Sequence, residues 1–183
     1  MSNPLPEAQQ ACLDRLLSRL QNDARIEAVL GGGSLVHGGF DAQSDLDLVI
    51  VVADGDYVEV MATRTQLAEG LGEFITGFTG EHVGEPRLLI CLYGPPLIHV
   101  DFKFIKADDL SQMVERPIIL WARDSEDITQ RLDAADIRWP DAPAEWFEAR
   151  AWIWLHYGAT KLQRGELWEA VAMLGFFREQ VLG

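Results

Sequence analysis

The pattern of apolar and polar positions changes once along the chain, near residue 139. Before that point, short apolar runs alternate with turns rich in glycine and proline, and some runs show the period of two that is typical of a strand. After it, apolar residues recur at helical spacing almost to the end of the sequence. We therefore expect a sheet-containing domain over residues 1–138 and a helical segment over residues 139–183.

The same pattern predicts the individual elements. Strands are expected over residues 26–30, 45–52, 74–79, 87–93, 97–105 and 118–121, the last at an edge of the sheet. Helices are expected over residues 4–22, 56–68, 108–114, 128–132, 143–164 and 166–182, with a single helical turn over residues 34–37. The tight turn Gly94-Pro95-Pro96 joins two of the strands and indicates an antiparallel hairpin.

The two C-terminal helices carry more apolar side chains than they can bury against each other. These residues are Trp146, Ile153, Trp154, Tyr157, Leu162, Leu167, Trp168, Val171, Leu174, Phe176 and Phe177. Three arrangements would cover them: packing on the sheet domain, a homodimer formed through these helices, or a bundle that is incomplete in this sequence.

The charge and the cysteines narrow the class of protein. The formal net charge is −14, which disfavours DNA or RNA as the main partner because nucleic-acid-binding proteins usually present a basic surface. This charge is compatible with a cationic small molecule, a protein partner or solubility alone. Cys12 and Cys91 lie far apart in apolar surroundings, which is typical of core thiols in a reducing compartment. Since the sequence shows neither a signal-peptide pattern nor an apolar run of about 20 residues, we expect a cytoplasmic protein without a membrane partner.

Candidate chemistry lies between the first two predicted strands. The glycine-rich turn at residues 31–34 is followed, after ten further residues, by Asp45 and Asp47 at the start of a strand. Because side chains alternate along a strand, both carboxylates point to the same face, with Cα atoms roughly 6.6 Å apart. Paired carboxylates suit Mg²⁺, and a bare glycine turn suits a chain of phosphates. Asp101 supplies a third carboxylate on the polar face of the strand over residues 97–105.

These motifs resemble a known signature. Gly33-Ser34, the ten-residue spacer, Asp45-Leu46-Asp47-Leu48 and the later Val100-Asp101-Phe102 resemble the nucleotidyltransferase motif of the DNA polymerase β-like superfamily. The likeness is to small bacterial enzymes similar to the aminoglycoside and lincosamide nucleotidyltransferases of antibiotic resistance, and the motifs span residues 26–105. The resemblance implies an α/β (α+β) fold with a mixed, mainly antiparallel sheet, flanking helices and a C-terminal helical segment.

The resemblance also implies an activity. It is the Mg²⁺-dependent transfer of a nucleoside monophosphate, AMP from ATP or its counterpart from another nucleoside triphosphate, to a hydroxyl of an aminoglycoside-like cationic acceptor. Two Mg²⁺ ions roughly 3.5–4 Å apart can stabilise both oxygens of such an in-line displacement. The residues expected to bind metal and to act in catalysis are Asp45, Asp47 and Asp101, and those expected to bind the nucleotide are Gly33, Ser34 and Lys161. Asp101 is either a metal ligand only or also the base that accepts the hydroxyl proton.

Each feature taken alone has a structural alternative. A glycine run is usually a loop, Asp45 and Asp47 are equally consistent with a solvated strand end, and Asp101 is able to pair with Lys103 or Arg87. Their joint order and spacing favour the nucleotidyltransferase interpretation. Two other functions stay open as alternatives. One is adenylylation of a partner protein, as in antitoxin nucleotidyltransferases, and the other is non-catalytic nucleotide binding.

Overall fold

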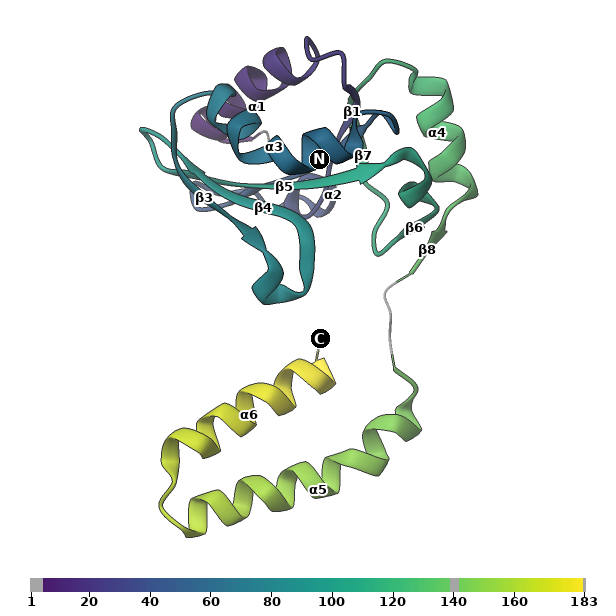
Figure 1. Cartoon of the computed structure of the whole chain (residues 1–183). Coiled ribbons are helices and arrows are strands. Elements are labelled where there is room, and N and C mark those ends of the chain that lie inside the picture. The colour runs from purple at the N-terminus through teal and green to yellow at the C-terminus, as the bar shows by residue number, and fades with distance from the viewer. Residues whose placement is uncertain (1–4, 139–141, 183) are drawn as a thin grey trace. The chain divides into compact units, whose positions relative to one another are not determined.

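The computed structural model describes residues 5–138 and 142–182. The chain divides into two units, Met1–Trp139 and Pro140–Gly183, each with its own internal packing (Figure 1). The stretch Trp139-Pro140-Asp141, where the sequence predicts the change from the sheet domain to the helical segment, lies outside the described residues.

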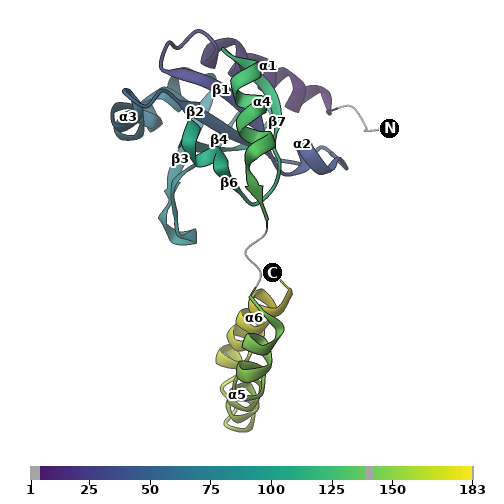
Figure 2. The same cartoon turned by 90° about the vertical axis from the view of Figure 1, so that its right-hand side faces the viewer.

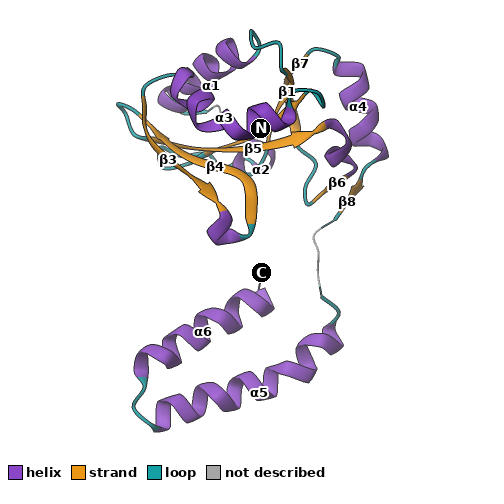
Figure 3. Ribbon diagram, viewed as in Figure 1, coloured by secondary structure: helices purple, strands orange, loops and turns teal. Residues whose placement is uncertain are grey.

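The first unit is built on a six-stranded sheet with the order β3-β4-β5-β2-β1-β7 (Figure 3). Only the central pair β2 and β5 is parallel, and every other neighbouring pair in this sheet is antiparallel. The strands are β1 (Ile26–Gly31), β2 (Leu46–Val52), β3 (Phe74–Gly80), β4 (Glu85–Tyr93), β5 (Ile98–Lys106) and β7 (Ile118–Ala122). The predicted α+β class with a mixed, mainly antiparallel sheet is confirmed, and β7 lies at an edge as expected.

One face of the sheet is apolar along its central strands up to Lys106, the last residue of β5. The helices α1 (Glu7–Leu20) and α3 (Tyr57–Gly70) lie on this face (Figure 1). Because side chains alternate along a strand, the even-numbered residues of β2 and β5 all point toward these two helices. The strand residues buried in this cluster are Leu46, Leu48, Ile50, Val52, Ile98, Val100, Phe102 and Phe104.

The opposite face of the sheet is apolar at one end and polar at the other. The helix α4 (Ser125–Ala134) and a 3-10 helix (Ala107–Ser111) cover the apolar end. The side chains buried there include Val49, Val51, Ile105, Leu110, Ile128 and Leu132. At the other end, the odd-numbered positions of β2 and β5 carry Asp47, Asp101 and Lys103. The candidate site therefore lies where the cover of α4 stops.

The predicted helix over residues 108–114 is wrong. The chain forms a 3-10 helix over Ala107–Ser111 and then the short strand β6 (Gln112–Met113), which pairs in parallel with β8 (Asp136–Ile137). The carboxylate of Asp109 accepts a hydrogen bond from the backbone N–H of Lys106 at 2.9 Å, which favours a single tight turn. Pairing with β8 then takes the backbone groups that a longer helix would have used.

The second unit is a pair of helices that lie side by side, α5 (Ala144–Gln163) and α6 (Leu167–Leu182) (Figure 2). Gly165 has a φ of 72° in the connection, a conformation that favours glycine, so the predicted stop of the first helix is confirmed. Trp154 packs edge-on against Phe176 with ring centroids 5.2 Å apart. Trp152 and Trp168 are 73% and 84% exposed, so the apolar excess expected from the sequence is present. No helix in the described residues is both long and apolar enough to cross a membrane.

The buried hydroxyl of Tyr93 provides a test of the sheet–helix packing. It donates a hydrogen bond of 2.7 Å to the carbonyl of Ala68 in α3. The variant Tyr93→Phe leaves that carbonyl without its donor, and we expect a loss of about 1–2 kcal/mol in the free energy of unfolding, measured by urea denaturation. Tyr57→Phe is the matched control, because its bond to the carbonyl of Phe104 is 3.3 Å long and partly exposed. Equal losses in the two variants would contradict this account.

Candidate active site

The glycine turn and Asp47 are built against each other. β1 ends at Gly31, and the N–H of Gly32 donates to the Asp47 carbonyl at 2.9 Å. Gly33 has φ 53° and ψ −128°, a backbone conformation that is essentially restricted to glycine. A Cβ at Gly33 would lie 3.0 Å from Asp47 Cγ and closer still to Oδ2. The missing side chain therefore makes room for the Asp47 carboxylate.

The register of the two parallel strands brings two of the predicted carboxylates together. Asp47 on β2 and Asp101 on β5 are direct partners in the ladder, so both side chains leave the same face of the sheet. Asp45 lies one residue before β2, which begins at Leu46 instead of at Asp45 as expected. Gly33, Asp47 and Asp101 line one cavity of about 310 Å³.

The carboxylates in this cavity repel one another. Burial raises the pKa of Asp47 to about 6, with further contributions from the negative charges of Asp45, Asp101 and Glu115. Burial also raises the pKa of Asp101, with Asp45 acting in the same direction and His99 in the opposite one. Carboxylates that repel one another in this way are expected in a site that binds a cation.

Two buried oxygen atoms in this region lack a hydrogen-bond partner among the described residues, Ser34 Oγ and Asp101 Oδ1. His99 Nε2 lies 2.8 Å from Asp101 Oδ1, at ion-pair distance but without the alignment of a hydrogen bond. Buried polar atoms normally have partners, so these two are candidates for contact with a bound ligand or ion.

Lys103 and Arg87 pair with Glu85, whereas the structural alternative drawn from the sequence paired them with Asp101. Lys103 Nζ lies 3.0 Å from Glu85 Oε2, and the Arg87 guanidinium makes two contacts of 2.8 Å with the same carboxylate. The hydrogen bonds from Arg87 and Lys103 lower the pKa of Glu85 to about 2. The pairing of Asp101 with Lys103 or Arg87 is therefore wrong in the described structure, and His99 is its basic neighbour.

Glu115 is a site residue that the sequence does not identify. Its Oε1 accepts a hydrogen bond from the N–H of Gly33 at 2.7 Å, and its Oε2 lies 2.7 Å from His37 Nε2. The contact joins positions 82 residues apart. Glu115 follows the segment wrongly predicted as a helix, so no local pattern could have placed it beside the glycine turn.

The carboxylates of the cavity fit a Mg²⁺ ion that takes its remaining ligands from a substrate and from water. In residues 5–138 and 142–182, no group of three or more His, Cys, Asp or Glu side chains is arranged to hold a metal on its own. Mg²⁺ usually takes only one or two carboxylates, and substrate phosphates and water fill its other positions. Asp47 and Asp101, with Asp45 beside them, provide oxygen ligands of that kind.

Lys161, the remaining predicted nucleotide-binding residue, belongs to the second unit. There its ammonium group pairs with Glu166 and lies 5.3 Å from the centre of the Tyr157 ring. The pair with Glu166 raises the pKa of Lys161. A nucleotide role for Lys161 therefore stays a prediction that rests on the family resemblance.

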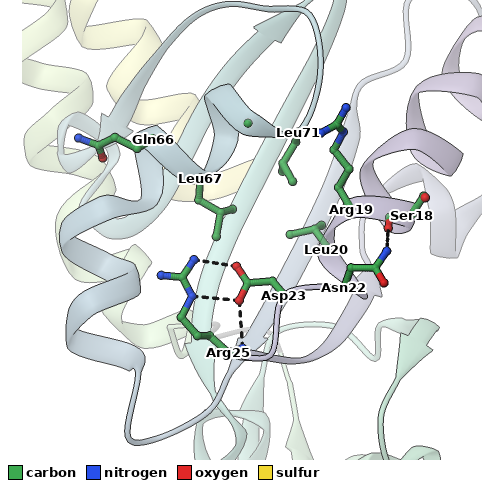
Figure 4. A pocket seen from close by; sticks show the side chains of 10 residues that line it. Ser18, Arg19, Leu20, Asn22, Asp23, Arg25, Gln66, Leu67 and Leu71 are labelled. Carbon is green, nitrogen blue, oxygen red and sulfur yellow. Dashed lines mark hydrogen bonds and ion pairs between the residues drawn. The ribbon is translucent and has the colours of Figure 1, made fainter.

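A second hollow lies at the C-terminal ends of α1 and α3, and its lining includes none of the carboxylates described above (Figure 4). Two of its charged residues, Arg25 and Asp23, form a 2.7 Å ion pair. This pairing lowers the pKa of Asp23. We assign this hollow no function.

No protein-family model matches the chain, and no curated protein matches it either. Function is therefore inferred from the residues of the cavity and from their resemblance to the nucleotidyltransferase motif.

Proposed function

We propose that this protein is a Mg²⁺-dependent nucleotidyltransferase that transfers AMP from ATP to a hydroxyl group. The observation that carries the proposal is the pairing of Asp47 with Asp101 across two parallel strands, directly beside the glycine turn at Gly33. A loop glycine or a solvated strand end would not require this close fit between the turn and a half-buried carboxylate.

The residues divide into a donor side and an acceptor side. On the donor side, the backbone N–H of Gly33 and the hydroxyl of Ser34 bind oxygens of the triphosphate. Asp45, Asp47 and Asp101 are the residues that would hold Mg²⁺, which would supply neutralisation of phosphate charge and polarisation of the reacting oxygens. On the acceptor side, Asp101 accepts the proton of the attacking hydroxyl, and His99 Nε2 lies 2.8 Å from its carboxylate.

The reaction is a substitution at the α-phosphorus. The acceptor oxygen forms a bond to this phosphorus while the bond to the oxygen that bridges to the β-phosphate breaks. Pyrophosphate leaves with the electron pair of the broken bond, and the hydroxyl proton moves to Asp101. The acidic chain, with a net charge of −14, favours a cationic acceptor such as an aminoglycoside.

A partner protein is the second candidate acceptor. The observation that favours it is the exposure of Trp152 and Trp168 on the second unit, since exposed aromatic side chains are typical of protein contact surfaces. The same donor chemistry would then adenylylate a side-chain hydroxyl of that partner.

The test follows a label from ATP to the acceptor. With Mg²⁺ and an aminoglycoside panel, label from the α-phosphate should appear on the acceptor and label from the γ-phosphate should appear in pyrophosphate. We expect Asp101→Asn to reduce transfer by about 10²–10⁴-fold, because it removes the proton acceptor. The matched control is Asp54→Asn, at an exposed aspartate outside the cavity, which should retain activity.

The location of the label separates the candidate acceptors. Label on a co-purifying protein instead of a small molecule would favour the partner-protein alternative. Transfer of γ-label to the acceptor, or equal turnover by the wild type and Asp101→Asn, would refute the proposed reaction.

A further inference from the structure

The carboxylate of Glu115 accepts the hydrogen bond that the glycine turn donates through the Gly33 N–H. Its Oε1 accepts a hydrogen bond from the N–H of Gly33 at 2.7 Å, and its Oε2 lies 2.7 Å from His37 Nε2. A Cβ at Gly32 would lie 2.9 Å from Oε1, so the carboxylate also lies directly against the backbone of the preceding glycine. The Glu115 side chain thus bridges Gly33 in the turn and His37, the last residue of α2 (Ser34–His37).

This side chain comes from a short connection held at one end. Glu115 lies between β6 and β7, outside any helix or strand. The next residue, Arg116, donates to the carbonyl of Leu132 at 2.8 Å and pairs with Asp133 at 2.5 Å, both on α4. The anchor therefore lies on α4, and the Glu115 side chain reaches from it to the glycine turn.

Electrostatics makes this position of Glu115 unfavourable unless something compensates for it. The cavity already holds Asp47 and Asp101, and the charge of Glu115 is one of those that raise the pKa of Asp47. The compensation comes from the Gly33 N–H and from His37. A carboxylate resembles part of a phosphate group, since both present negatively charged oxygens to N–H donors.

We propose that Glu115 is an internal stand-in for a substrate phosphate, which accepts the Gly33 N–H when no nucleotide is bound and is displaced when a nucleoside triphosphate binds. This inference rests on the proposed function, because it takes Gly33 as the phosphate-binding group. Glu115 therefore competes with the nucleotide, in contrast to Asp47 and Asp101, which would bind it through Mg²⁺. The residue lowers nucleotide affinity and keeps the turn in its binding conformation.

The test measures binding of a non-reactive nucleotide, α,β-methylene-ATP, in the presence of Mg²⁺ by calorimetry. We expect Glu115→Ala to bind it about tenfold more tightly, since the variant no longer breaks a charge-assisted hydrogen bond on binding. Removal of any negative charge could strengthen binding of an anion, so Glu115→Asp is the control. It retains the charge but is one methylene too short to bridge Gly33 and His37, and it should keep most of the gain.

An amide resonance reports the contact directly. In ¹⁵N-labelled protein, the Gly33 N–H signal of the wild type should shift both on Glu115→Ala substitution and on addition of the nucleotide. In Glu115→Ala, the nucleotide should still shift it, which shows that the nucleotide takes the vacated donor. His37→Ala removes the second contact of Glu115, and we expect severalfold tighter binding; it carries the test should Glu115→Ala not fold.

The outcomes separate this inference from the proposed function. If the wild type binds the nucleotide and Glu115→Ala binds it equally or more weakly, Glu115 is not a competitor and the inference is overturned alone. A gain in Glu115→Ala that disappears in Glu115→Asp overturns it as well, because charge alone then explains the effect. If neither the wild type nor any variant binds the nucleotide, the proposed function and this inference fail together.

Discussion

Asp47→Asn is expected to abolish nucleotidyl transfer and, at pH 8, to make the fold more stable. The folded protein raises the pKa of this carboxyl from 3.8 to about 6, through burial first and then through neighbouring negative charges. A charged Asp47 is therefore unfavourable in the folded state at neutral and alkaline pH. Asparagine has nearly the same shape and no charge, so the variant escapes this repulsion while it loses the proposed metal ligand.

The pH dependence has a definite sign. Because the pKa of Asp47 is higher in the folded than in the unfolded chain, the folded state binds more protons between about pH 4 and pH 6, and stability falls as pH rises through this window. One pKa unit corresponds to about 1.4 kcal/mol. Allowing for the partial exposure of the side chain, we expect Asp47→Asn to gain about 1–2 kcal/mol at pH 8. The gain should shrink as pH falls through 6 and vanish near pH 4.

Urea denaturation of the wild type and Asp47→Asn at several pH values measures this difference, without added Mg²⁺. Transfer from α-labelled ATP, measured on the same samples, should fall by at least about 10²-fold. Asp54→Asn is the control, because it removes an exposed carboxylate outside the cavity and should change neither property. An Asp47→Asn variant that is less stable than the wild type at pH 8 would show that this carboxylate has a structural partner, contrary to the description above.

The part of the site that follows from local pattern could be predicted from the sequence. Strand alternation places Asp47 opposite the apolar face of β2, and the same rule applied to β5 places Asp101 on the polar face. The change from Asp47 to Val49 and Val51 along one face of β2 also signals that a cover begins there, and α4 provides it. These features depend on residues a few positions apart, so the chain itself carries the information.

The contacts that depend on tertiary structure could not be predicted in this way. Glu115 reaches Gly33 across 82 residues, from a segment whose acidic start resembles a helix cap but which forms only a 3-10 turn. Arg87 and Lys103 were expected to be possible partners of Asp101, and the antiparallel pairing of β4 with β5 instead lets both reach Glu85. Which carboxylate a basic residue contacts is decided by strand register and chain path, which apolar periodicity does not report.

Gly33→Ala is expected to lose both stability and activity, because it places a methyl group where the Asp47 carboxylate lies. The backbone at Gly33 has φ 53° and ψ −128°, and a Cβ there would be 3.0 Å from Asp47 Cγ. The backbone conformation costs a non-glycine residue about 1–3 kcal/mol. The steric conflict should add about 1–3 kcal/mol, since the atoms that the methyl group would meet all belong to the half-buried Asp47 side chain, which must then turn away from its position. Transfer should fall as in Asp47→Asn, because the carboxylate is displaced.

Gly38→Ala separates the two contributions. Gly38 has a comparable conformation, with φ 78° and ψ −169°, but a Cβ there would meet no atom within 4 Å. It should show the backbone cost alone and retain transfer activity. In the double variant Gly33→Ala/Asp47→Ala, removal of the carboxylate relieves the steric conflict. Relative to Asp47→Ala, only the backbone cost should then remain. If Gly33→Ala loses no more stability than Gly38→Ala in urea denaturation, then the turn and Asp47 are not built against each other, and the proposed phosphate-binding turn beside a metal-binding carboxylate loses its structural basis.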